Sequence, residues 1–379
     1  MTRTPRTSLC TLPLLAALVA GCEQLPSSRV QGPVSAEDSI GSVPIDPASW
    51  SRLGYSLEWR SQPYVTEDGG IREVIVGDDL IVALDRSNMV SVIEANSGRR
   101  RGVEHVASPL IEHHGLVRLG NTVWVCGESE ALGVDLTSVL MTGRQPYEHI
   151  VGTPPLSLGG FLVFGASTGE VRTHSLLDGV ARWSNAVEGS VEYAPVAVGQ
   201  GGTVTAIGVV SNSGEALFID PFDGRAISRS RMFDAAGATP ESGSGLLFVA
   251  SRDQSLYAFA PGQQSPYWRV RCDAPLSRRP VHMDGVVYCD LPGVGFSAID
   301  ARSGKVQRSN RELAGEVVGT RGASLLVWDG RTLSLVDKAR LDVLEQSELP
   351  GVARVISPAE DRLYLVGERG LVVRLRQRS

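Results

Sequence analysis

The sequence predicts an all-β fold, an eight-bladed β-propeller, because one short sequence motif recurs about every 40 residues and no helical periodicity is sustained. Each copy contains a β-rich run, a polar turn, a second β-rich run and a Gly-containing turn. The first apolar residue of each copy is one of Leu80, Val123, Leu162, Val204, Leu246, Val286, Leu325 and Leu363. This period is typical of four-stranded propeller blades, so eight copies predict eight blades.

The ends of the repeat array predict how the ring closes. The eighth copy stops at residues 371–375 and leaves no room for an outer strand. An unmatched strand, residues 56–60, precedes the first copy and contains Trp59. We therefore expect this N-terminal strand to complete the last blade, which removes a free sheet edge and gives one circular domain over residues 55–379.

Turn residues and tryptophans support the blade assignment. Dipeptides such as Asp223-Gly224 and Ser303-Gly304 supply the positive φ that a tight turn requires. Trp183 and Trp268 follow such turns in the third and fifth copies, where an outer strand is expected. These large aromatic side chains are predicted to pack between neighbouring blades.

The N-terminus is typical of an export signal. Arg3 and Arg6 precede an apolar run over residues 9–20, which is too short to span a bilayer as a helix. We assign residues 1–21 to a signal peptide. Residues 22–54 are rich in Ser, Pro and Gly and are predicted to form a flexible tether.

The residues before the first retained cysteine carry a second signal. Val19-Ala20-Gly21-Cys22 resembles the lipobox of bacterial lipoproteins, which implies cleavage before Cys22 and acylation of that cysteine, with palmitate among the attached chains. Glu23 follows in place of the aspartate that retains such proteins in the inner membrane. The resemblance therefore implies lipid anchoring in the outer membrane, facing the periplasm.

Several binding chemistries are unsupported by the sequence. The formal net charge is -6, and no basic stripe is long enough to follow a phosphate backbone, so nucleic acid is not expected as a partner. The six histidines show no chelating spacing, and phosphate-binding glycine loops are absent. We predict neither a metal nor a cofactor.

Two motifs have structural interpretations that compete with chemical ones. Residues 165–169 match the G-x-S-x-G nucleophile motif, but they fall between two predicted strands, where a hairpin turn is favoured over a hydrolase site. Cys126, Cys272 and Cys289 would remain in the mature chain. Buried thiols are favoured for them, and a disulfide between Cys272 and Cys289 stays open.

The repeat resembles a known family. An outer-strand tryptophan, the strand ending Ala298-Ile299-Asp300 and the turn Ser303-Gly304-Lys305 look like the PQQ-like propeller repeat. With a lipobox and eight copies, the chain is similar to the BamB-like propeller lipoproteins of the outer-membrane β-barrel assembly machinery. No two cysteines are adjacent, so the vicinal disulfide of the quinoprotein dehydrogenases is missing. The resemblance implies a scaffold rather than an enzyme.

The expected function is therefore to bind a protein partner in the cell envelope, as a monomeric propeller anchored to the membrane by lipid. Arginine and aromatic residues in loops are favoured at interface hot spots, and we select Arg278, Arg279, Tyr193 and Phe233 as candidate partner-binding residues. The alternative is an envelope module that binds glycan or another ligand in the central channel. A catalytic or redox protein is the third reading.

Overall fold

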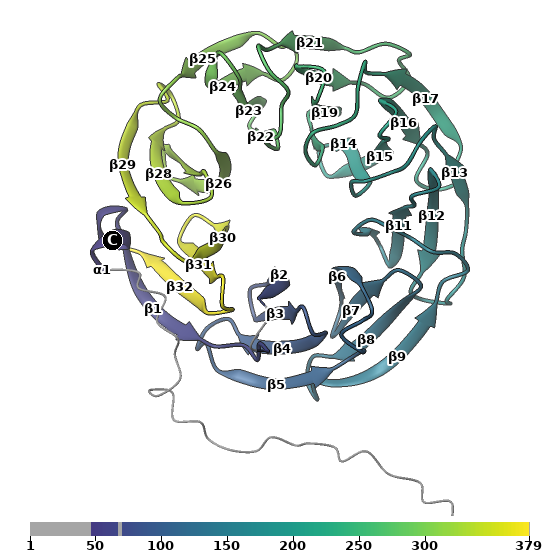
Figure 1. The fold of residues 1–379 in the computed structure, drawn as a ribbon, viewed down its shortest axis with the longest axis vertical. Helices are drawn as coiled ribbons and strands as arrows, with labels where there is room; N and C mark the ends of the chain where they lie inside the picture. Colours follow the sequence, from purple (N-terminus) through teal and green to yellow (C-terminus); the bar gives the residue numbers. More distant parts are fainter. Residues whose placement is uncertain (1–46, 67–69, 379) are drawn as a thin grey trace, which may run out of the picture. The chain divides into compact units, whose positions relative to one another are not determined.

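The computed structural model describes residues 47–66 and 70–378, which form eight four-stranded antiparallel sheets arranged as the blades of a ring (Figure 1). The predicted fold class is confirmed. The first strand of each blade is innermost, and the fourth strand lies at the rim (Figure 1). All eight residues that mark the repeat in the sequence lie in the second strand of a blade.

The first four blades follow the chain from residue 71 to residue 231. Blade 1 contains β2 (Ile71–Val76), β3 (Leu80–Asp85), β4 (Met89–Glu94) and β5 (Arg100–His105). Blade 2 contains β6 (His113–Leu119), β7 (Thr122–Gly127), β8 (Glu130–Asp135) and β9 (Leu140–Pro146). Blade 3 contains β10 (Leu156–Leu158), β11 (Phe161–Gly165), β12 (Glu170–Ser175) and β13 (Ser184–Ala186). Blade 4 contains β14 (Val196–Gln200), β15 (Thr203–Val210), β16 (Glu215–Ile219) and β17 (Ala226–Arg231).

The remaining four blades end with the one that both ends of the chain build. Blade 5 contains β18 (Glu241–Gly243), β19 (Leu246–Ser251), β20 (Ser255–Phe259) and β21 (Trp268–Arg271). Blade 6 contains β22 (Val281–Met283), β23 (Val286–Leu291), β24 (Gly295–Asp300) and β25 (Val306–Asn310). Blade 7 contains β26 (Glu316–Arg321), β27 (Ser324–Trp328), β28 (Thr332–Asp337) and β29 (Val343–Glu348). Blade 8 contains β30 (Val352–Ala359), β31 (Arg362–Gly367), β32 (Val372–Gln377) and β1 (Tyr55–Ser61).

The core consists of apolar layers between blades rather than one central cluster. Every residue of β3 and of β19 is buried, whereas β29 at the rim has one buried residue of six. A middle strand is covered on both faces by the two neighbouring blades, which explains its nearly continuous apolar sequence. Within the described residues the apolar clusters number eight, and each joins one adjacent pair of blades.

Tryptophan side chains join neighbouring blades, as predicted. The Trp268 indole donates to the Ala301 carbonyl oxygen at 2.9 Å, and the Trp59 indole donates to the Ala95 oxygen at 3.0 Å. Each ring lies on a turn glycine of the next blade, where a Cβ would come within 2.7 Å of the ring. Trp183 packs in the same way against Gly224.

The N-terminal strand closes the ring as expected. β1 pairs antiparallel with β32, from Tyr55 opposite Gln377 to Ser61 opposite Val372. Just before β1 the chain forms a short helix, α1 (Pro47–Arg52), which packs against β1 and β29. Trp50 and Leu53 are buried in the apolar layer between blades 7 and 8.

The domain boundaries are only partly visible. The expected start of the propeller at residue 55 coincides with the first residue of β1, but α1 and the buried Leu53 extend the packed region toward the N-terminus. The predicted signal peptide, Cys22 and most of the predicted tether lie outside the described residues. Among the residues that are described, no helix is long and apolar enough to cross a membrane.

The tryptophan contacts predict unequal costs for glycine substitutions in the turns between the third and fourth strands of blades 5 and 6. Gly304 has φ +68° and lies on the Trp268 ring, whereas Gly262 has φ +85° and an added Cβ would meet no atom within 4 Å. We expect Gly262→Ala to lower the free energy of unfolding by about 1 kcal/mol through backbone strain alone. Gly304→Ala adds a steric clash and should cost about 2–4 kcal/mol in total.

Chemical denaturation of the two variants measures this difference. Equal midpoints for Gly304→Ala and Gly262→Ala would show that the contact between Trp268 and the turn does not stabilise the blade interface.

Candidate partner-binding face

The strand order gives the ring two distinct faces. Since all blades are antiparallel, the links between blades and the turns joining second to third strands lie on one face, here called the connection face. The turns that join first to second and third to fourth strands lie on the opposite face, here called the turn face. All four predicted partner-binding residues lie on the connection face, in the links that follow blades 3, 4 and 5.

The two predicted arginines are held by carboxylates of their own chain. The Arg279 Nε donates to Glu241 Oε2 at 3.0 Å, and its backbone N–H donates to Glu316 Oε1 at 3.0 Å. Arg278 pairs with Asp290 at 3.4 Å. These contacts connect blades 5, 6 and 7, so charge reversal at Arg279 would bring like charges together and disturb the fold.

Tyr193 and Phe233 differ in exposure. Tyr193 is half-buried and packs against the apolar layer between blades 4 and 5. The Phe233 side chain is 82% exposed, with the Arg269 guanidinium 4.9 Å from its ring centre. Of the four predicted residues, Phe233 alone presents a large apolar group to solvent.

A buried carboxylate holds the base of the Phe233 loop. Asp253 Oδ2 accepts the Phe233 backbone N–H at 3.1 Å and the Tyr257 hydroxyl at 2.5 Å. Burial, together with the hydrogen bond to Asp253, raises the pKa of Tyr257 to about 12, so this hydroxyl remains a donor at neutral pH. The aromatic tip is therefore presented on a rigid base.

Sequence reasoning missed two further apolar tips on this face. Leu110, in the link after blade 1, is 95% exposed, and Ile150, in the link after blade 2, is 71% exposed. Each has an apolar neighbour in its link, Ile111 or Val151, so the sequence alone does not mark which residue stays exposed. These side chains contribute little to the core and are accessible to a partner at this face.

A buried polar pair anchors the loop that carries Leu110. Asn88, fully buried, donates from Nδ2 to the carbonyl oxygens of Ser108 at 2.7 Å and Ile111 at 2.9 Å. Its Oδ1 lies 2.8 Å from Nδ1 of the buried His113. Burial, assisted by the nearby Arg72 guanidinium, lowers the pKa of His113 to about 4, so the neutral imidazole completes this pair.

The other predicted motifs have structural roles. The G-x-S-x-G segment is the tight turn between β11 and β12, closed by hydrogen bonds from Ala166 N–H to Glu170 O and from Gly169 N–H to Ala166 O. The turn interpretation is confirmed. Cys272 and Cys289 are free buried thiols of one apolar layer, and the disulfide is not formed. Burial raises the pKa of Cys272 to about 11, far from the range of a reactive thiolate.

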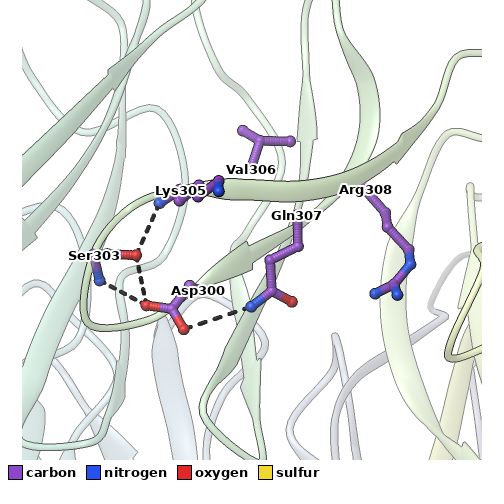
Figure 2. Close-up of a pocket in the computed structure, with 6 residues that line it drawn as sticks. All are labelled: Asp300, Ser303, Lys305, Val306, Gln307 and Arg308. Carbon is purple, nitrogen blue, oxygen red and sulfur yellow. Dashed lines mark hydrogen bonds between the residues drawn. The ribbon is translucent and has the colours of Figure 1, made fainter.

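A hollow of about 560 Å³ lies on the outer part of blade 6, away from the connection face (Figure 2). It is lined by Asp300, Ser303, Lys305, Val306, Gln307 and Arg308. The Asp300 carboxylate accepts the Ser303 N–H at 2.8 Å and its hydroxyl at 2.7 Å, and these bonds lower the pKa of Asp300. This carboxylate is therefore occupied in shaping its turn.

The His113 pair predicts a pH dependence of stability. Because the pKa of an unfolded histidine is near 6.5 and that of folded His113 is about 4, the unfolded chain binds more protons between these values. The contribution of neutral His113 is thus fully present above pH 6.5 and is lost as the pH falls toward 4, by about 2–3 kcal/mol.

Denaturation midpoints at pH 7.5 and 4.5 test this, with the exposed His105→Gln as the control variant for His113→Gln. The His113→Gln protein should lose less stability on acidification than the His105→Gln protein. The same loss in both would mean that the pKa of His113 is the same in the folded and unfolded chains.

Comparison with known proteins supports the repeat assignment. A PQQ-repeat family model, described as outer membrane protein assembly factor BamB, matches residues 212–355. The matched segment runs from blade 4 to the first strand of blade 8. No curated protein sequence matches the chain significantly.

Solved structures with the same fold include a designed and a natural propeller. The computationally designed Ika8 protein has a TM-score of 0.66 and 11% identity, over 83% of this chain and 100% of its own. BamB from Moraxella catarrhalis has a TM-score of 0.64 and 13% identity, over 85% of this chain and 99% of its own. At these identities the likeness shows the fold. With the repeat motifs and the family-model match, the chain is an eight-bladed propeller of PQQ-like repeats that resembles BamB.

Proposed function

We propose that this chain is a lipid-anchored periplasmic scaffold that binds a protein of outer-membrane assembly through its connection face. The observation that carries the proposal is the set of exposed apolar tips on that face, Leu110, Ile150 and Phe233, mounted on a rigid ring. Large apolar side chains on fixed loops are suited to filling pockets of a partner. The match to a family model described as an assembly factor supports the class of partner.

The anchor belongs to the same proposal. Acylation of Cys22 would attach the chain to the outer membrane, and the residues from 22 to 46 would act as the tether. As a flexible coil, these 25 residues span about 25–30 Å. This length keeps the ring near the bilayer while leaving it free to meet a partner.

The proposal assigns no catalytic residue and no cofactor. Ser167 lies in the tight turn between two strands, and the three cysteines of the described chain are buried thiols. A rigid ring with apolar loop tips is sufficient for a scaffold. One chain already completes all eight four-stranded sheets, so a monomer suffices.

Mild crosslinking of the native lipoprotein in its envelope, followed by mass spectrometry, tests the proposal. We expect an outer-membrane barrel-assembly protein to be recovered with the wild type. Leu110→Asp and Phe233→Asp should each reduce its recovery at least ten-fold, because a charge replaces an apolar contact in the interface.

Leu344→Asp is the matched control, since Leu344 is 46% exposed on β29 at the rim. Equal recovery with Leu110→Asp, Phe233→Asp and Leu344→Asp, or recovery of the propeller alone, would reject binding through the connection face.

A further inference from the structure

One turn geometry recurs on the turn face, between the third and fourth strands of six blades. In each, the N–H of the fifth residue donates to the carbonyl oxygen of the first at 2.8 to 3.0 Å. The six pairs are Gly98 to Glu94, Val139 to Asp135, Gly179 to Ser175, Gly224 to Asp220, Gly304 to Asp300 and Leu341 to Asp337. The fifth residue has φ between +53° and +74° in every case. The repeat thus provides six copies of one turn.

The third residue of this turn is its exposed tip, and it differs between blades. Blades 1, 2, 6 and 7 place a polar or small residue there, namely Asn96, Thr137, Arg302 and Ala339. Blades 3 and 4 instead place Leu177, 72% exposed, and Phe222, 88% exposed. Because the same turn forms with asparagine or threonine at its tip, the fold does not require the apolar side chains.

The two turns that carry the apolar tips are fixed to each other. The Trp183 ring, beside the blade 3 turn, packs on Gly224 of the blade 4 turn. Asn185 Nδ2 donates to the Gly224 carbonyl oxygen at 2.9 Å. Asp220 Oδ1 accepts the Phe222 N–H at 2.8 Å, which holds the tip outward. We call Leu177, Val180 and Phe222 the apolar tip patch, and Val180 is 42% exposed.

The charges around the apolar tip patch compensate one another locally. Asp178 pairs with Arg182 within the blade 3 turn. Asp223 pairs with Arg225 at 2.8 Å within the blade 4 turn. The patch therefore offers apolar side chains without a cationic field, so a surface that binds it need not be anionic.

The chain joins the propeller on the same face as this patch. Tyr55 lies opposite Gln377, at the end of β32 where the other blades have their third-to-fourth-strand turn. Arg378 N–H donates to the Gly54 oxygen at 2.9 Å, and the Arg378 side chain donates to Ser51 Oγ at 2.9 Å. α1 thus sits at blades 7 and 8, across the ring from blades 3 and 4 (Figure 1).

We propose that the apolar tip patch docks on the lipid bilayer to which the chain is anchored, with Leu177, Val180 and Phe222 at the boundary of headgroups and acyl chains. The inference rests on the anchor in the proposed function, because only 24 residues lie between Cys22 and Pro47, where the described chain begins. A few apolar side chains bind a bilayer weakly on their own. Once the lipid anchor is inserted, binding of the patch to the same bilayer becomes intramolecular and is therefore favoured. Two contacts on opposite sides of one face would hold the ring flat on the membrane.

Photocrosslinking in vesicles tests this docking. The acylated full-length lipoprotein is reconstituted in phosphatidylcholine vesicles that contain a phosphatidylcholine with a diazirine in its acyl chain. After flotation and irradiation, mass spectrometry locates the lipid adducts. We expect adducts in residues 176–182 and 220–225, at a yield unaffected by 0.5 M salt.

Matched variants separate docking from general proximity to lipid. Leu177→Asn with Phe222→Asn introduces the residue that blade 1 has at the same tip and should reduce these adducts at least ten-fold. Phe233→Asn, which removes an equally exposed phenylalanine from the connection face, should leave them unchanged.

The other outcomes distinguish the two proposals. A protein that floats but carries its adducts on the connection face, or evenly on both faces, overturns the docking while the anchor stands. Adducts on these turns that persist in the Leu177→Asn, Phe222→Asn protein also overturn it. A protein that does not float contradicts the anchor, and the docking that rests on it fails with it.

Discussion

The fold depends on closure of the ring by the pairing of β1 with β32. Each blade buries its middle strands only because neighbouring blades cover both of its faces. If the ring were not closed, the apolar faces of the two end blades would be exposed to solvent. The layer between blades 8 and 1 contains Trp59 from β1 together with Tyr364 and Ile81. Arg374, buried in blade 8, pairs with Glu58 at 2.8 Å and also reaches the Ala95 oxygen of blade 1. Closure thus completes both a sheet and an interface.

The fold could be predicted because its causes are local and repeated. A strand covered on both faces has a continuous apolar sequence, and a turn with positive φ favours glycine. Both features are therefore recognisable in the sequence of each repeat. α1 could not be predicted in the same way. Its Trp50 and Leu53 are buried by blades 7 and 8, which lie near the other end of the chain, while the composition around them suggests only a tether.

The candidate site was less predictable because it depends on contacts between blades. Arg279 has the sequence appearance of a free loop arginine, but its partner Glu241 is supplied by the inner strand of blade 5. Tyr193 is drawn into an apolar layer for the same reason. Phe233, by contrast, stays exposed because no neighbouring blade covers its ring. Exposure is a property of the assembled ring, and single loops do not reveal it.

The closure pair has a further consequence for the order of events as the chain is made. Among the described strands, β1 is synthesised first, and β32, with which it pairs, is synthesised last. Leu53 is held by Arg321 of blade 7, so the segment before β1 also waits for the late part of the chain. Throughout elongation the N-terminal strand is an unpaired edge, and a chain that stops before Val372 never covers it. Completion of the ring therefore requires synthesis through β32, and a product that ends before this strand keeps an exposed edge that chaperones or proteases can recognise.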